Sequence, residues 1–224
     1  NDHQILGVAS GLAGRDDLDG VRVFHLAGRF GLDVLQPLGE SGALLAALHP
    51  VRSLTHNQLL LADFMQTACV AEGNDAALAR LRPLVESIGG TWMPVNSMNR
   101  GLYHAALSIV SNVTKAVSWK AQKWLEEAGL PTETSAELTN QLLNSTTQDL
   151  LRFGASKSIT GPIIRGDTST VEAHIAELEA SRPADVDVYK LFIRTVFELA
   201  EERGDLDEAT LQQFQNILAR PGND

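Results

Sequence analysis

A row of polar residues in the middle of the chain has the spacing and the chemistry of a small-molecule site. With 100° of rotation per residue, a helix over residues 97–128 brings one set onto a single side: Arg100, His104, Ser108, Ser111 and Lys115. Asn112 lies at the margin of this side. An arginine can hold a carboxylate, an imidazole can transfer protons near neutral pH, and hydroxyls donate hydrogen bonds.

Two interpretations of this helix side are open: a solvated face, or the wall of a polar crevice. A solvated face usually carries many charges of both signs, whereas no acid occurs here between Arg100 and Lys120. The composition therefore favours the crevice. The catalytic candidates are Arg100, His104 and Asn112. The substrate-binding candidates on the same helix are Ser108 and Ser111.

Two histidines, His25 and His49, each end a short apolar run that is typical of a buried strand. In open parallel sheets, ligands bind outside the carboxyl ends of the strands. The two imidazoles are therefore candidates for one site, although a histidine at the end of a strand can also be purely structural.

A tightly shaped turn is expected over residues 158–167, where Gly161-Pro162 is followed by Arg165-Gly166-Asp167. One interpretation is a loop in which Asp167 or Thr168 caps the next helix. The other is that Arg165 binds an anionic ligand or closes a contact between subunits.

Several well-known site motifs are missing from the sequence. A dinucleotide site normally begins with Gly-x-Gly-x-x-Gly between a strand and a helix, and the nearest candidate, residues 7–14, contains no Gly-x-Gly. The chain also contains no His-Glu-x-x-His, no Walker-type loop and no Gly-x-Ser-x-Gly. We therefore expect no metal site.

Composition narrows the classes of partner. The formal charge is −10 and the pI is about 5.0, which argues against binding to a nucleic-acid backbone. The single cysteine, Cys69, allows no disulfide within the chain and suits a reducing cytoplasm. No apolar stretch reaches the length of a membrane span, so we expect no membrane partner.

The first part of the chain alternates short apolar runs with helical patterns. The strand-like runs cover residues 5–9, 21–26, 44–48, 64–70 and 91–95, and helical patterns cover residues 32–39 and 74–88. Short continuous strands that alternate with helices predict an α/β domain with a buried, mostly parallel sheet.

After residue 96 the pattern becomes helical throughout. The predicted helices cover residues 97–128, 135–153, 167–179, 187–203 and 206–218, and Ser169-x-x-Glu172 is a plausible capping box for the third. The fold class predicted is therefore α/β followed by all-α, with domains at residues 1–96 and 97–224.

Three segments resemble a known family, the Rossmann-like plus DUF2520 proteins. They are residues 24–28 with 42–53, residues 102–112 and residues 159–167. That family is similar to NAD(P) oxidoreductases of the 6-phosphogluconate dehydrogenase-like and ketopantoate reductase-like types. The resemblance implies a partial Rossmann-type parallel sheet that lacks its first βαβ unit. It also implies a helical domain like the C-terminal domain of 6-phosphogluconate dehydrogenase, which helps to form a homodimer.

The resemblance also implies a cofactor, NADP or NAD, and residues that would contact it. The cofactor-binding candidates are Ser10, His25, Gly28, His49 and Pro50. Further substrate-binding candidates, possible across a dimer, are Thr160, Gly161 and Arg165.

Related enzymes carry a lysine and an asparagine near the start of the first long helix, where this chain has Arg100 and His104. Arginine stays charged near neutrality and is a poor proton donor, so His104 is the better candidate for a general acid.

Two functions from different classes follow. The first is an NAD(P)-dependent oxidoreductase acting on a small 2-oxo acid or a related carbonyl or imine. The second is a non-enzymatic dimeric remnant, or a regulatory or binding module, that has lost the cofactor site. The missing glycine motif and Arg100 in place of lysine favour the second, whereas the polar helix side and the two histidines favour the first.

Overall fold

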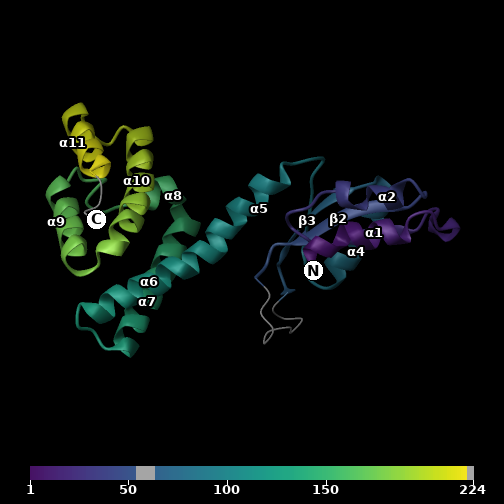
Figure 1. Ribbon diagram of the computed structural model, residues 1–224, viewed down its shortest axis with the longest axis horizontal. Helices are drawn as coiled ribbons and strands as arrows, with labels where there is room; N and C mark the ends of the chain where they lie inside the picture. The colour runs from purple at the N-terminus through teal and green to yellow at the C-terminus, as the bar shows by residue number, and fades with distance from the viewer. Residues whose placement is uncertain (54–63, 221–224) are drawn as a thin grey trace. The chain divides into compact units, whose positions relative to one another are not determined.

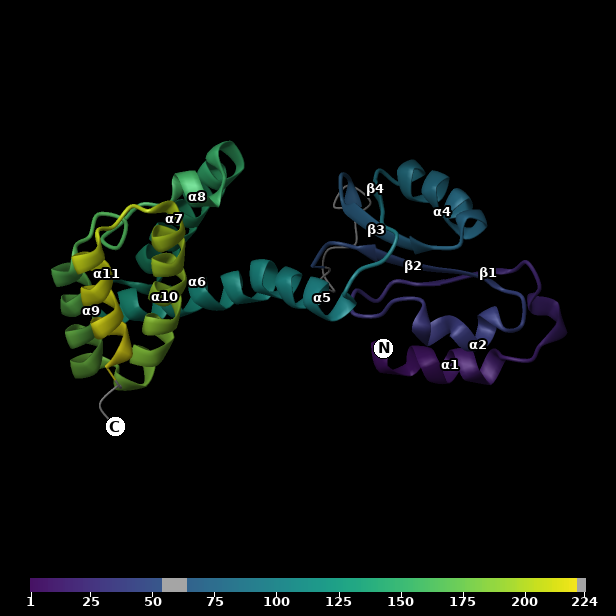
Figure 2. The same cartoon turned by 90° about the horizontal axis from the view of Figure 1, so that it is seen from above.

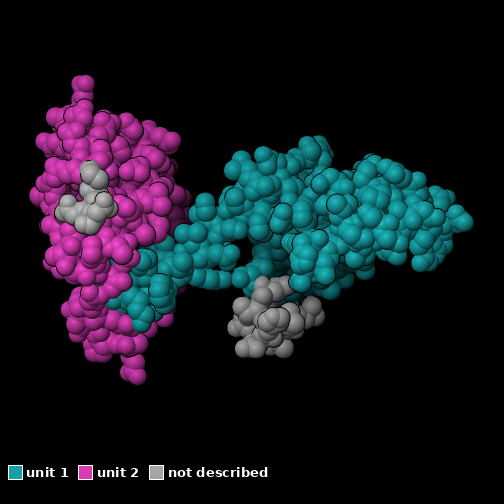
Figure 3. Space-filling view, in the orientation of Figure 1, with its two compact units in different colours: residues 1–124 teal, residues 125–224 magenta. Residues whose placement is uncertain are grey.

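The computed structural model describes residues 1–53 and 64–220. The chain divides into two compact units, Asn1–Trp124 and Leu125–Asp224 (Figure 3).

Unit 1 is built on a sheet, which in the described residues has four strands in the order β1-β2-β3-β4. The strands are β1 (Arg22–His25), β2 (Leu44–Pro50), β3 (Ala68–Gly73) and β4 (Thr91–Pro94). The pairs β1–β2 and β3–β4 are parallel, which confirms the mostly parallel sheet, and β2–β3 is antiparallel.

Helices cover both faces of this sheet. Helices α1 (Ile5–Leu12) and α2 (Gln36–Gly39) lie on one face and α4 (Asp75–Ser87) on the other (Figure 2). Side chains of β2 alternate accordingly. Leu45 packs with Leu35 and Leu38 on the first face, and Leu48 packs with Val85 on the second. Short 3-10 helices at Asp2–Gln4, Asp16–Leu18 and Asp33–Leu35 complete the first layer.

The prediction of a strand at residues 5–9 is wrong, because these residues form the first turns of α1. A short apolar run cannot be assigned to strand or helix from its periodicity alone. In the folded protein Ala9 is buried in the cluster of α2 and β2, and Ile5 packs against that cluster, whereas Leu6 and Val8 are exposed. Ser10 therefore lies on the exposed side of a helix, and its prediction as a residue at a strand end is corrected.

The predicted long helix exists in three parts: α5 (Arg100–Ser108), a π-helical turn (Ile109–Val113) and α6 (Thr114–Glu127). It begins at Arg100 because the side chain of Asn99 accepts a hydrogen bond from the backbone N–H of Leu102 at 3.0 Å. The wider π turn changes the rotation of the helix near its middle, and such turns are frequent at functional sites.

Unit 2 is helical. It contains α7 (Thr132–Phe153), α8 (Ala155–Ser158), α9 (Thr168–Ser181), a 3-10 helix (Pro183–Asp185), α10 (Val186–Arg203) and α11 (Glu208–Ala219). Helices α9, α10 and α11 pack together (Figure 1). Their shared core includes Val171, Phe197 and Phe214, and the two aromatic rings lie 5.9 Å apart between centroids.

Helix α9 is capped at its start by Asp167, which was one of the two interpretations of the turn before it. The side chain of Asp167 accepts from the backbone N–H of Thr170 at 3.0 Å, so Asp167 is the N-cap and the predicted Ser169–Glu172 capping box is wrong. The Thr170 and Ser169 hydroxyls also donate to this carboxylate and, with the backbone bond, lower its pKa to about 2. Asp167 was the other predicted cap of this helix. Its side chain directly precedes the first turn of α9 and can therefore accept from a backbone N–H group that has no partner within the helix.

None of the helices in residues 1–53 and 64–220 is long and apolar enough to cross a membrane.

Candidate functional site

A pocket of about 490 Å³ lies in unit 1, beside the carboxyl end of β2 and one side of α5 and the π turn. Its lining residues are His49, Val51, Arg52, Ser53, His104, Leu107, Ser108, Val110, Ser111 and Asn112. Four of the five helix residues that were predicted as catalytic or substrate-binding therefore line one cavity, together with one of the two strand-end histidines. A volume of this size suits a small organic ligand.

The π turn shapes this wall of the pocket. Ser111 and Asn112 lie within the turn, while His104 and Ser108 lie on α5 before it. A regular α-helix would leave Asn112 at the margin of the polar side, whereas here it lines the cavity with the others. The extra residue of the π turn thus brings Asn112 to the cavity beside Ser108 and Ser111.

His49 is held in place by Tyr103, which was not among the residues predicted for the site. The Nδ1 atom of His49 is hydrogen-bonded to the Tyr103 hydroxyl at 2.8 Å, and the two rings meet edge to face with centroids 5.6 Å apart. Because Nδ1 is engaged, Nε2 is the nitrogen that remains for a ligand. Burial raises the pKa of Tyr103, so its hydroxyl stays protonated.

The pKa of His49 is lowered from its ordinary value of 6.5, first by burial and then by the positive charges of His104 and Arg100. The His104 ring lies 6.5 Å away between centroids. His49 is therefore a neutral imidazole near pH 7, next to a second imidazole. Such a pair can hold and exchange protons without both rings becoming charged.

This depressed pKa makes a prediction about stability. Unfolded His49 binds a proton near pH 6.5 and the folded residue binds it only at lower pH, so folding loses stability as the pH falls below about 6.5. We expect NMR titration of labelled histidines, assigned with His49→Asn, to give a His49 pKa below 6.5. We expect His104→Gln to raise that pKa, because a neighbouring positive charge is removed. A His49 pKa at or above 6.5 in the unmodified protein contradicts this account.

Gly28 lies where the two imidazoles approach the loop after β1. A Cβ atom added at this position would be 2.7 Å from both Cε1 and Nε2 of His49 and 3.0 Å from Cδ2 of His104. These distances are shorter than ordinary contacts, so a side chain here would displace His49. The structure thus gives a steric reason for glycine at position 28, and it places that residue beside His49 and His104.

His25 is buried and forms hydrogen bonds to the loop after β1, which also carries Gly28. Its Nδ1 accepts from the backbone N–H of Ala27 at 3.2 Å, so the proton is on Nε2, which donates to the carbonyl of Gly31 at 2.8 Å. Both ring nitrogens are therefore used within the protein. His25 orients the segment that carries Gly28, and its predicted contact with a cofactor is not favoured by this geometry.

Arg100 forms a buried ion pair with Glu72. Its Nε and Nη2 atoms donate to one carboxylate oxygen of Glu72 at 3.0 and 2.8 Å, and the two side chains are 7% and 14% exposed. The guanidinium carbon lies 5.8 Å from the centre of the Tyr103 ring. Arg100 does not line the pocket. Its position therefore favours support of Tyr103 over the predicted grip on a substrate carboxylate.

The remaining predicted residues lie elsewhere. Pro50 ends β2 next to the pocket without lining it. Thr160, Gly161 and Arg165 lie in unit 2, in the turn before α9, where Thr160 and Arg165 are exposed and Gly161 has a φ of +110° that suits glycine.

Tyr103, Glu72 and Ser53 were missed because their roles depend on partners far away in the sequence. Glu72 has the clearest local signal: it is an acid at the end of an otherwise apolar strand. The sheet register aligns it with Ala47 and, through Ala47, with His25, so these three residues share one sheet face.

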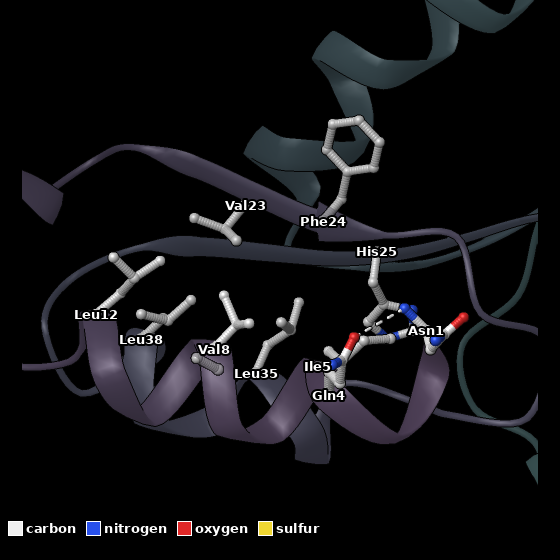
Figure 4. A pocket seen from close by; sticks show the side chains of 11 residues that line it. Asn1, Gln4, Ile5, Val8, Leu12, Val23, Phe24, His25, Leu35 and Leu38 are labelled. Carbon is white, nitrogen blue, oxygen red and sulfur yellow. Dashed lines mark hydrogen bonds between the residues drawn. The ribbon is translucent and has the colours of Figure 1, made fainter.

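Other places in the described chain offer less chemistry. A groove of about 300 Å³ between α1 and β1 is lined mainly by apolar side chains such as Val8, Leu12 and Leu38 (Figure 4). The His25 ring reaches it, but both of its nitrogens are already bonded. Within residues 1–53 and 64–220, no group of three or more histidines, cysteines and acids could hold a metal ion.

Comparison with protein families places both parts of the chain. Residues 1–50 match the model of a Rossmann-like domain, and residues 67–196 match the model described as a domain of unknown function, DUF2520. No curated protein matches the chain by sequence similarity.

Three solved structures show the same fold. A Thermotoga maritima protein is 24% identical with a TM-score of 0.71, and the match covers 91% of this chain and 76% of that one. An NADP oxidoreductase-like protein from Bacteroides fragilis is 21% identical with a TM-score of 0.67, covering 88% and 71%. A pyrroline-5-carboxylate reductase from Coxiella burnetii is 19% identical with a TM-score of 0.50, covering 98% and 73%. The predicted order, a Rossmann-like part followed by a helical part, is confirmed.

Proposed function

Because the chain belongs to the DUF2520 family, we propose that it supplies the substrate-binding side of an NAD(P)-dependent oxidoreductase. Its substrate is a small 2-oxo acid or a related carbonyl or imine. The observation that carries this proposal is the pocket in which His49 meets His104 and three further polar residues of the helix. The NADP oxidoreductase-like and pyrroline-5-carboxylate reductase structures of the same fold support the choice of reaction class.

In this proposal His104 is the proton donor to the substrate oxygen or nitrogen. Arg100 is unsuited to this role because it is paired with Glu72 and does not line the pocket, and guanidinium groups are in general poor proton donors. His49, a neutral imidazole held by Tyr103, faces the same atom with Nε2. Ser108 and Asn112 orient the substrate through hydrogen bonds, and bound nicotinamide supplies or accepts the hydride.

The described residues fit only one end of such a cofactor. Gly28 keeps the loop after β1 free of a side chain beside His49, at the sheet edge where a nicotinamide ring is expected. The chain contains no Gly-x-Gly-x-x-Gly, so we assign none of its residues to the pyrophosphate. Gly28 and His49 are the residues that we propose beside the nicotinamide, while the choice between NADP and NAD is left to titration.

The proposal is tested by titrating the protein with NADPH and with NADH, followed by turnover assays with a panel of small 2-oxo acids and imines. We expect binding of one nucleotide, detected by calorimetry, and oxidation of the reduced form with at least one substrate. Absence of binding at millimolar nucleotide would overturn it.

One observation favours the second candidate, a non-enzymatic dimeric module. Arg100, which stands where related enzymes carry a catalytic lysine, is committed to Glu72. Under this alternative the protein still dimerises but binds neither nucleotide, so the same titration separates the two functions.

We also propose that the protein is a homodimer through its helical region. Helix α7 exposes a series of large apolar side chains: Leu138, Leu142, Leu150, Leu151 and Phe153. Full burial of such a side chain contributes about 1.5–3 kcal/mol. We further propose a cytoplasmic location, which a single free cysteine suits, and no nucleic-acid partner, which the formal charge of −10 favours.

The dimer gives a specific prediction. We expect analytical ultracentrifugation to show a dimer at micromolar concentration, and Leu142→Glu combined with Leu151→Glu to shift it to monomer. These side chains are 69% and 84% exposed within the single chain, so the changes should leave the fold intact. Gln148→Glu, at an exposed polar position of the same helix, is the control. A protein that is monomeric before any substitution contradicts the proposal.

A further inference from the structure

Lys115 lies at one side of the pocket and is held there by hydroxyl groups. Its Nζ atom donates to the Oγ of Ser53 at 2.9 Å and to the Oγ of Ser111 at 3.4 Å. Both serines line the cavity. In the part of the chain that the structure describes, the hydrogen bonds of this ammonium group therefore go to neutral partners, which leave its charge uncompensated.

Among the residues that the structure describes, the ten that line the pocket include no aspartate or glutamate, and the ammonium group of Lys115 contacts two of them. This is unusual in a chain with 28 acids and a formal charge of −10. A cationic pocket in an acidic protein favours a small anion over a cation or an apolar ligand.

An ammonium group has three N–H donors, and two of them are engaged with Ser53 and Ser111. The remaining donor and the two hydroxyls form a set that can bind the oxygens of an anion. The other end of the cavity carries the imidazoles of His49 and His104. The pocket thus has an anion-binding end and a proton-transfer end.

We infer that Lys115, Ser53 and Ser111 form a carboxylate-binding subsite, which anchors a small 2-oxo acid with its reacting carbonyl toward the imidazoles. This deepens the proposed function by assigning the anchor for the acid group. It moves the anchor from Arg100, which the sequence predicted and which Glu72 occupies, to a lysine further along the same helix. The anion-binding end does not itself depend on a nicotinamide.

The test uses oxamate, a redox-inert analogue of a 2-oxo acid, with the whole protein and no nucleotide. We expect oxamate to bind, as seen by calorimetry and by shifts of the His104 ring signals in NMR spectra. A hydrogen bond to a charged group contributes enough that Lys115→Met should weaken binding by about 10- to 100-fold. Lys157→Met, at an exposed lysine of unit 2, is the matched control and should leave binding unchanged. Unfolding temperatures of both variants verify that they remain folded.

Each result decides the question. Failure of the unmodified protein to bind oxamate, or equal affinity in Lys115→Met, overturns the inference. Binding of inorganic phosphate in place of oxamate, with the same dependence on Lys115, overturns the carboxylate assignment and identifies a phosphate site. If oxamate binds through Lys115 while NADPH and NADH do not bind, the subsite stands and the oxidoreductase proposal falls. If a nucleotide binds and oxamate does not, the carboxylate subsite falls and the proposal of an oxidoreductase stands.

Discussion

Replacing Arg100 with methionine is expected to lower the free energy of unfolding by about 3–5 kcal/mol, because it leaves the carboxylate of Glu72 buried without its partner. Glu72 is only 14% exposed, and the Nε and Nη2 atoms of Arg100 both donate to one of its oxygens. Unfolding in urea, followed by circular dichroism, measures the change. A loss below about 1 kcal/mol would show that water reaches this ion pair readily.

A double variant separates the ion pair from simple loss of packing. When Arg100→Met is combined with Glu72→Leu, no charge remains buried, and most of the lost stability should return. The same variants report on the site, since Arg100 contributes to the low pKa of His49 and lies over the Tyr103 ring. We therefore expect Arg100→Met to raise the pKa of His49 toward its ordinary value. An unchanged His49 pKa contradicts the link between the ion pair and the pocket.

If the proposed function is correct, His104 is the residue whose replacement should reduce catalysis most. Replacing His104 with glutamine is expected to lower kcat by about 10²- to 10⁴-fold, the usual contribution of a positioned general acid. Affinity for oxamate should change far less, because the anion-binding end of the pocket is built from other residues. The measurement is steady-state oxidation of the reduced nucleotide with the best substrate from the panel.

His3→Gln is the matched control for this experiment, since His3 is exposed in a short 3-10 helix near the start of the chain and does not line the pocket. It should retain full activity. If His104→Gln keeps activity within a few-fold of the unmodified protein, His104 is not the acid, and His49 becomes the candidate to test next by the same substitution.

The elements of this protein are largely readable from its residues, because helix and strand periods and end signals act over short distances. Helix α10 ends at the predicted position because Gly204 adopts the left-handed conformation, and α4 spans Asp75–Ser87, where a helix was predicted over residues 74–88. The spacing of His104, Ser108 and Ser111 predicted that they share one side, and all three line the cavity.

Tertiary contacts changed several local preferences. The side chain of Asn74 accepts from the backbone N–H of Leu45 at 2.5 Å, which ties α4 to β2 instead of capping its own helix. The run at residues 5–9 has the composition of a buried strand and is a helix, because its position against α2 and β2 decides which side chains are buried.

What the sequence by itself determined is most of the order of strands and helices after residue 9, the family, and a polar helix side that includes His104. What only the tertiary structure decided is which groups meet. The pairs His49–Tyr103 and Arg100–Glu72 are 54 and 28 residues apart along the chain, and Lys115 reaches Ser53 across 62. Periodicity reports the direction of a side chain from its own element. Hydrogen bonds and ion pairs between elements depend on how those elements pack. Packing put Arg100, the predicted substrate anchor, into a buried ion pair with Glu72, and for this reason we propose Lys115 as the anchor instead.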